Sequence, residues 1–454
     1  MRLRRTLLAA LGFVTFTPLA SAAEPLVKPA DELPPPPTVS DPMLAPVPQA
    51  RRLLRTWEEA LVLVKSRSIE LRSALADVSK AEAQWRTALA GALPNISGNA
   101  SLTHQPINTS LFSAATSGNN TANANLTLIQ PLLATRAWYA IGTADQAIDV
   151  ARLNVEDAKR LIALRVANGM VAVVTAERIA ELNRLGLRSA LERLELTQRK
   201  ATLGAATGLD VVRARQDVEA TRGNLVTGDE SLRQAREALG LALGVAEPVG
   251  VPPEVRIDGL ESAAVAACKP APRIEDRPDV ASAQAGIALA ERGQGDATRQ
   301  FVPIIDFRSS LSSTAVDREG LPVQNTWNIQ AVLTVPIWDG GARYGALRSA
   351  AADQERAALR QESLRRTATI EVAQARRGVD VASQARAVAS QSRDLAVETD
   401  RLVRRAYQEG RGTSLELVTA ANTLRQSDIN LALREFDLVK ARVLAVLSLA
   451  TCPY

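Results

Sequence analysis

Four short segments of the chain alternate between apolar and polar positions, whereas the stretches between them follow the longer period of helices. The alternation is clearest in 325–335, where Trp327 and Ile329 share one side and Asn328 and Gln330 the other. Such a period of two indicates strands with one apolar face. The predicted strands are 95–104, 121–131, 304–314 and 325–335.

Two long stretches, 132–247 and 337–452, contain no proline, and each is predicted to break once, at the glycines of 204–208 in the first and of 410–412 in the second. Because proline inside a helix costs about 3 kcal/mol, such stretches permit very long helices. Each is expected to fold as a helical hairpin with a glycine-bearing tip. The predicted arms are 134–203 and 209–246 in the first stretch, and 342–409 and 413–450 in the second; the tips are 204–208 and 410–414.

The same design occurs twice along the chain. The segment from Gly204 to Val211 returns 206 positions later as the segment from Gly410 to Leu417, with Thr207 matching Thr413. A leading helix precedes each strand pair, at 70–92 and at 279–301. We therefore expect a mainly α chain with a small β part, built from two helix–strand–strand–hairpin repeats over 51–265 and 266–454.

The first 50 residues differ from the repeats. Residues 1–23 combine a basic start, an apolar centre and a small-residue cleavage site, which is typical of a secretory signal peptide. Residues 24–50 are rich in proline, which predicts an extended, loosely attached lead-in without a packed core.

Export changes the interpretation of the strands. About ten residues with an apolar and a polar side are what a strand of a transmembrane β-barrel needs. A soluble sheet with one buried face is the alternative, but the polar side carries asparagine and threonine rather than a second apolar layer. The residues predicted to face lipid are Leu126, Leu128, Phe307, Trp327, Ile329 and Leu333.

Four strands cannot enclose a lumen, and open strand edges do not persist in lipid. The barrel must therefore close between copies of the chain. The long helices lead to the same expectation, because they are too long for the core of one copy.

Charge and composition exclude several classes of function. The net charge of +5 falls to about +2 without the three arginines of the signal peptide, and the remaining Arg and Glu alternate along helices. With 3% aromatic residues and no basic cluster, nucleic acid is not an expected partner. One histidine, His104, and the absence of a phosphate-binding loop leave no predicted catalytic, metal or cofactor site.

Two cysteines, Cys268 and Cys452, follow the first repeat and end the second. In an oxidising compartment they could pair, and two unpaired thiols are the alternative.

The chain resembles the TolC family of outer-membrane efflux ducts from about residue 56 to its end. The resemblance is carried by Trp57-Glu58-Glu59-Ala60-Leu61, by Leu93-Pro94, by the segment from Ile337 to Arg343, and by the two glycine tips. It implies a homotrimer with a 12-strand barrel in the outer membrane and a long α-helical barrel in the periplasm. It also implies two protein partners, a periplasmic adaptor (membrane fusion) protein and an inner-membrane RND or ABC transporter, and contact with outer-membrane lipid.

The resemblance also suggests a periplasmic gate. Tyr407 and Asp210 match a tyrosine and an aspartate that link neighbouring hairpins in the family, so a Tyr407–Asp210 hydrogen bond is expected. Glu416 matches an acidic residue that narrows the entrance, whereas Thr419 replaces the family's second acid. Arg411 precedes Gly412, where the family has a small residue followed by arginine.

The tips themselves match positions that meet the adaptor in the family. These residues are Gly204, Thr207, Gly208, Gly410, Gly412 and Thr413. Glycine suits both a positive φ and a close approach by a partner backbone, and a purely structural role in the turn is the alternative.

Two functions from different classes remain in competition. The first is a passive exit duct for drug efflux or type I secretion, with the substrate selected by the inner-membrane transporter. The second is a trimeric coiled-coil scaffold of the cell envelope, such as an adhesin stalk. A stalk needs one uninterrupted heptad pattern, so the duplicated strand pairs favour the duct.

Overall fold

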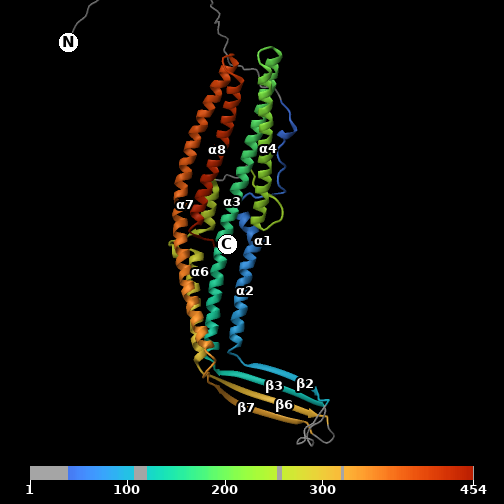
Figure 1. Cartoon of the computed structure of the whole chain (residues 1–454), viewed down its shortest axis with the longest axis vertical. Coiled ribbons are helices and arrows are strands. Elements are labelled where there is room, and N and C mark those ends of the chain that lie inside the picture. Colours follow the sequence, from blue (N-terminus) through green and yellow to red (C-terminus); the bar gives the residue numbers. More distant parts are fainter. Residues whose placement is uncertain (1–38, 107–119, 253–257, 318–321, 453–454) are drawn as a thin grey trace, which may run out of the picture.

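The computed structural model describes residues 39–106, 120–252, 258–317 and 322–452, so the predicted signal peptide and residues 24–38 lie outside it. The molecule is elongated, with a β-sheet at one end and two helical hairpin tips at the other (Figure 1). The α-helices are α1 (Trp57–Arg67), α2 (Ile69–Ala90), α3 (Thr135–Thr202), α4 (Gly208–Leu243), α5 (Asp258–Ala267), α6 (Pro278–Thr298), α7 (Ala342–Gln408) and α8 (Ser414–Leu447). The four long strands are β2 (Asn95–His104), β3 (Asn120–Leu133), β6 (Ile304–Val316) and β7 (Gln324–Thr334).

The two longest helices confirm the expectation drawn from proline placement. Helix α3 has 68 residues and α7 has 67, which at about 1.5 Å per residue corresponds to roughly 100 Å each. Ion pairs three or four residues apart, such as Arg178–Glu181 and Arg401–Glu398, line their exposed faces. No helix in the described ranges combines the length and the apolar character needed to cross a bilayer.

Each long helix is accompanied by two shorter helices placed end to end. Helices α2 and α4 pack along α3, and α6 and α8 pack along α7 (Figure 1). In the first repeat the joint requires Gly244, which ends α4 with a φ of 78°. A Cβ at this position would lie 2.5 Å from the carbonyl oxygen of Arg67, so only glycine allows α4 to meet the α1–α2 turn.

The joint of the second repeat uses a side chain instead. Arg277 is buried at the start of α6 and donates to the carbonyl oxygen of Ser448, just past α8, at 3.3 Å. Its guanidinium also pairs with Asp279 and with Glu371 of α7 at 2.8 Å and 2.7 Å. This arginine therefore connects the start of α6 and the end of α8 to the middle of α7.

The four long strands form one antiparallel sheet in the order β2-β3-β6-β7. Strands β2 and β7 are its edges, so each has one side without a strand partner in the single chain. Two helix–strand–strand units thus meet at the β3–β6 pair (Figure 1).

The main hydrophobic core lies at mid-height rather than in the hairpins or the sheet. Trp57 and Val64 of α1 pack there with Ile162 and Val166 of α3 and with Leu447 of α8. Short elements surround this core: the parallel pair β1 (Arg52–Leu53) and β4 (Val249–Gly250), helix α5, and the antiparallel pair β5 (Lys269–Pro270) and β8 (Ala450–Thr451). The described residues also contain three 3₁₀ turns, Pro42–Leu44, Ile274–Asp276 and Arg299–Phe301.

The lead-in differs from the expectation of a loosely attached segment. The side chain of Asp41 is only 8% exposed and forms an ion pair with Arg222 of α4 at 2.6 Å, and Met43 and Leu44 pack on the small core formed by α3 and α4. Further along, Arg236 donates to the carbonyl oxygen of Pro48 at 2.7 Å. Past the 3₁₀ turn at Pro42–Leu44 the lead-in is extended, and an extended segment of this kind makes no internal hydrogen bonds, so its carbonyl oxygens can accept from arginines of the hairpin.

Candidate functional site

The two hairpin tips are built from the same capping arrangement. At the first tip, the Thr207 hydroxyl accepts from the Asp210 amide at 3.3 Å, and the Asp210 carboxylate accepts from the Thr207 amide at 2.9 Å. Thr413 and Glu416 repeat this exchange at the second tip, at 3.2 Å and 2.8 Å. Each pair satisfies amides at the start of a helix that have no partner within that helix.

The tip glycines serve different purposes. Gly204 and Gly410 have φ values of 75° and 76°, which favour glycine. Gly412 has no room for a side chain, because a Cβ there would lie 2.9 Å from the amide nitrogen of Tyr407. By contrast, no atom lies within 4 Å of a Cβ built on Gly204, Gly208 or Gly410, so these positions are open to a partner.

Side chains link the two tips to each other. Ser414 donates to the Asp210 carboxylate at 2.5 Å and so connects α8 to α4. Lys200, near the end of α3, places its ammonium 3.8 Å from the centre of the Tyr407 ring and donates to the Tyr407 carbonyl oxygen at 3.4 Å. Both contacts join the first hairpin to the second.

The predicted gate residues are therefore close together, but their partners differ from those expected. Within one chain, Tyr407 contacts Lys200 rather than Asp210, and Asp210 contacts Ser414. Arg411 forms an ion pair with Glu409 of its own hairpin. Sequence reasoning missed Lys200 and Ser414, although the match of Ser414 with Gly208 in the repeat placed it at the tip.

Two carboxylates at the tips, those of Asp210 and Glu416, have lowered pKa values. The Ser414 hydroxyl, followed by the amide and hydroxyl of Thr207, lowers the pKa of Asp210 below its ordinary value. The amide and hydroxyl of Thr413 lower the pKa of Glu416 in the same way. Both groups are anionic at neutral pH, so the tips carry fixed negative charge.

At the opposite end of the molecule, the strand register separates the two faces of the sheet. Leu126 pairs with Leu311, which pairs with Trp327; two residues further along, Leu128 and Ile329 flank Ser309. Because paired residues point to the same side, all six residues predicted to face lipid lie on one face. The residues between them, including Asn125 and Asn328, lie on the other face.

The apolar face is exposed in the single chain. Trp327 is 70% exposed, Leu333 61% and Leu126 50%. Leu128 and Phe307 are half-buried. Exposed apolar patches of this extent are typical of a surface that contacts lipid or protein.

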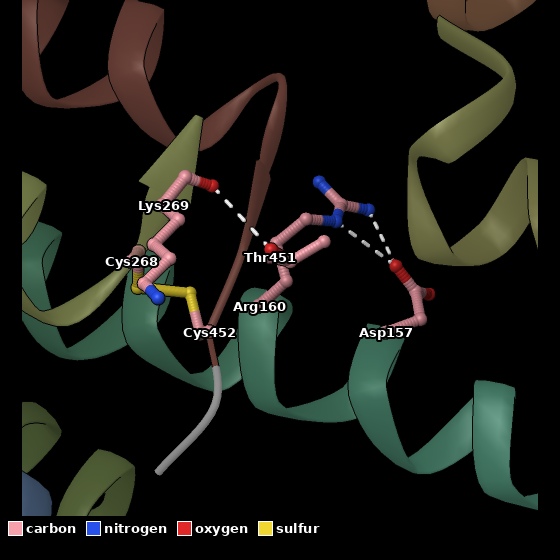
Figure 2. Close-up of a disulfide and its surroundings, with 6 residues drawn as sticks. All are labelled: Asp157, Arg160, Cys268, Lys269, Thr451 and Cys452. Carbon is pink, nitrogen blue, oxygen red and sulfur yellow. Dashed lines mark hydrogen bonds and ion pairs between the residues drawn. A yellow bond between two sulfur atoms is a disulfide. The ribbon is translucent and has the colours of Figure 1, made fainter. Parts of the chain in front are cut away.

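Between these two ends, a disulfide joins Cys268 to Cys452 (Figure 2). Both cysteines are fully buried in the mid-height core. Next to them, β5 pairs with β8, and the Thr451 hydroxyl donates to the Lys269 carbonyl oxygen at 3.5 Å (Figure 2). The disulfide thus ties the segment after the first repeat to the end of the second.

The described residues contain no group of three or more His, Cys, Asp or Glu side chains arranged to hold a metal ion. His104, at the end of β2, lies 2.7 Å from the Asn120 side chain of β3.

Comparison with known proteins gives consistent matches along the chain. The model of the family described as outer membrane efflux protein matches residues 60–245 and 273–445. Nodulation protein T of Rhizobium leguminosarum bv. trifolii is 28% identical over 402 residues, which cover 85% of this chain and 83% of the relative. The cation efflux system protein CusC of Escherichia coli K12 is 25% identical over 78% of this chain and 78% of its own.

A solved structure shares the fold. The crystal structure of a membrane protein from Pseudomonas aeruginosa superposes with a TM-score of 0.73 at 23% identity, covering 91% of this chain and 99% of that one.

Proposed function

This chain belongs to the outer membrane efflux protein family, and we propose that three copies of it close into one continuous duct. The protein is an outer-membrane efflux channel with a periplasmic helical part, and it acts as the exit duct of an efflux pump. The two repeats of the chain provide the material for both parts of such a duct.

One observation carries the proposal of a shared barrel: the sheet has an exposed apolar face and two edges without partners. Backbone groups without hydrogen-bond partners are costly in lipid, so β7 of one copy must pair with β2 of the next. Three copies supply twelve strands, which leaves a lumen lined by the Asn, Ser and Thr residues of the polar face. A four-strand sheet cannot close alone.

The hairpin tips form the periplasmic entrance of the proposed duct. The contacts Ser414–Asp210 and Lys200–Tyr407 hold the hairpins of one copy together at this end. Glu416 and Arg411 add charge around the opening. A Tyr407–Asp210 hydrogen bond between neighbouring hairpins remains part of the proposal.

The partners follow from the open tips and from the lack of a predicted energy-converting site. A periplasmic adaptor protein docks at the tip residues, where Gly204, Gly208 and Gly410 leave space for its backbone. An inner-membrane transporter of the RND or ABC type supplies the energy. The duct itself is passive, is not an enzyme and uses no cofactor.

The purified full-length protein tests the proposal. Native mass spectrometry in detergent is expected to show a trimer, and planar lipid bilayers are expected to show pores of low conductance. A trimeric coiled-coil scaffold would give a trimer without pores. A folded monomer that stays single and conducts no current would contradict the duct.

A further inference from the structure

A buried carboxylate joins the two hairpins behind their tips. Asp217 of α4 is only 5% exposed, and both of its carboxylate oxygens are occupied. One accepts from Arg193 of α3 at 2.6 Å, within the same hairpin. The other accepts from the Asn422 amide of α8 at 2.8 Å, across to the second hairpin. One side chain is thus shared by three helices and both repeats.

The Asp217–Asn422 contact resembles the Asp210–Ser414 contact at the tips and lies further from the tips along the same two helices. Asp217 follows Asp210 by seven residues on α4, and Asn422 follows Ser414 by eight on α8. At about 1.5 Å per residue, the second contact lies roughly 10–12 Å behind the first. Positions seven apart lie on the same face of a helix, so one face of α4 presents two carboxylates to α8.

The surroundings make the contact depend on the arrangement of the hairpins. Arg425 follows Asn422 by about one turn on α8, and its side chain packs against α3 at Gly186. A Cβ at Gly186 would lie only 2.6 Å from the Cδ of Arg425. The pKa of Arg425 is lowered, chiefly because the guanidinium is buried. Attraction by Asp217 acts in the opposite direction, and repulsion by Arg193 lowers the pKa further. On α7, Arg404 is paired with Asp400, so it does not compete for Asp217.

A buried carboxylate that loses one of its partners is left with an unsatisfied oxygen, which is costly in a water-poor interior. If α8 moves away from α4, Asp217 keeps Arg193 but loses Asn422. The penalty arises only in that displaced arrangement. It therefore favours the arrangement in which the hairpins lie together.

We propose that Asp217 and Asn422 form a second interlock of the entrance, behind the tip link, which must separate before the duct opens. This inference rests on the proposed function as a gated duct. Asp217 and Asn422 are positioning residues: they hold the two hairpins and need not contact the transported substrate.

The test is the gating of full-length trimers in planar bilayers. Asn422→Leu keeps the branched shape of the side chain but removes the donor to Asp217. We expect the ratio of open to closed time to rise about tenfold, which corresponds to about 1.4 kcal/mol. Gln426→Leu is the control for the amide-to-leucine change, because Gln426 lies one turn further along α8, is exposed and has no hydrogen bond within the described residues.

Exchanging the two side chains separates gating from packing. The double variant Asp217→Asn, Asn422→Asp restores one amide and one carboxylate across the hairpins, with Arg193 and Arg425 still beside them. It is expected to return the open-to-closed ratio to that of the wild type. A residue that only supports the fold would change the melting temperature without this recovery of gating.

Unchanged gating in assembled Asn422→Leu trimers would overturn the interlock. Asn422→Ala carries the same expectation if the leucine variant does not assemble. A wild-type trimer without pores would instead count against the duct itself, so the two failures are distinguishable.

Discussion

At the scale of single residues, the contact between Ser414 and Asp210 gives the most direct test of the tip. Replacing Ser414 with Ala removes the donor across the hairpins but leaves the Thr207–Asp210 capping exchange in place. Single-channel conductance of the variant is therefore expected to exceed that of the wild type, while the helix content stays the same. Equal conductance would show that this hydrogen bond does not hold the entrance.

The stabilisation from the Ser414–Asp210 hydrogen bond depends on pH, because it requires the ionised carboxylate of Asp210. The pKa of Asp210 is lowered in the folded protein, chiefly by Ser414, from an ordinary value of 3.8. A lowered pKa means that the stabilisation is fully present above the ordinary value and is lost only as the pH falls through the lower one. Wild-type conductance should thus be flat between about pH 5 and about pH 8 with respect to this group.

Gly208 permits a test of adaptor docking that leaves the fold intact. It begins α4 in an ordinary helical conformation, and a Cβ there meets no atom within 4 Å. Gly208→Trp should therefore retain pores in bilayers but lose binding to the adaptor in a pull-down. Gly223→Trp, equally open but four turns into α4, should keep both. Loss of binding in both variants would show that the tip is not the specific docking point.

At the scale of elements, the disulfide stabilises the middle of the molecule. Cys268 and Cys452 are 184 residues apart, and cross-links over long loops stabilise proteins by about 2–4 kcal/mol. The double variant Cys268→Ser, Cys452→Ser should have a lower melting temperature than the wild type. Alkylation of the denatured, unreduced wild type should label no thiol; two labelled thiols would contradict the bond.

The regular elements could be predicted from the sequence because their patterns are local. The two proline-free stretches, each broken at Gly204 or Gly410, predicted the hairpins, and the alternation of apolar and polar residues predicted the sheet. The elements around the core could not be predicted in this way. The two-residue strands pair Arg52 with Val249 and Lys269 with Thr451, so each depends on a contact between distant segments.

In the candidate site, too, the local contacts could be predicted from the sequence and the long-range contacts could not. The capping pairs at the tips span three residues and are visible in the sequence. The partners of Tyr407 and Asp217 are not, because Lys200 and Asn422 lie more than 200 positions away from them. Family resemblance placed Tyr407 and Asp210 at the gate, but the register of α3 against α7 and of α4 against α8 decides which atoms meet.

At the scale of the whole molecule, the two repeats share a design but are covered differently. The lead-in covers part of the first hairpin, whereas α7 of the second keeps an apolar stripe in solvent. Its residues recur every seven positions and are 51–71% exposed: Val381, Val388, Leu395 and Leu402. A stripe of this period is typical of a helix that packs against another helix.

This stripe predicts where neighbouring copies meet along the helical barrel. Leu395→Glu places a charge within it and should raise the dissociation constant of the trimer at least about tenfold, or about 1.4 kcal/mol. Ser383→Glu adds the same charge to an exposed position on the opposite side of α7 and should leave assembly unchanged. Native mass spectrometry over a dilution series measures both. Equal dissociation of the two variants would place the subunit interface elsewhere.

The two faces of the sheet then decide the orientation of the barrel. Ile329 lies at the centre of β7 on the apolar face, opposite Ser309, and is 59% exposed. An arginine facing lipid near the middle of the bilayer costs about 2–4 kcal/mol, so Ile329→Arg should reduce the amount of trimer recovered from the outer membrane. The adjacent Asn328 lies on the polar face opposite Ser310, so Asn328→Arg places the same charge in the aqueous lumen and should assemble normally. If Asn328→Arg were the variant that failed to insert, the apolar face would line the lumen and the proposed barrel would be inside out.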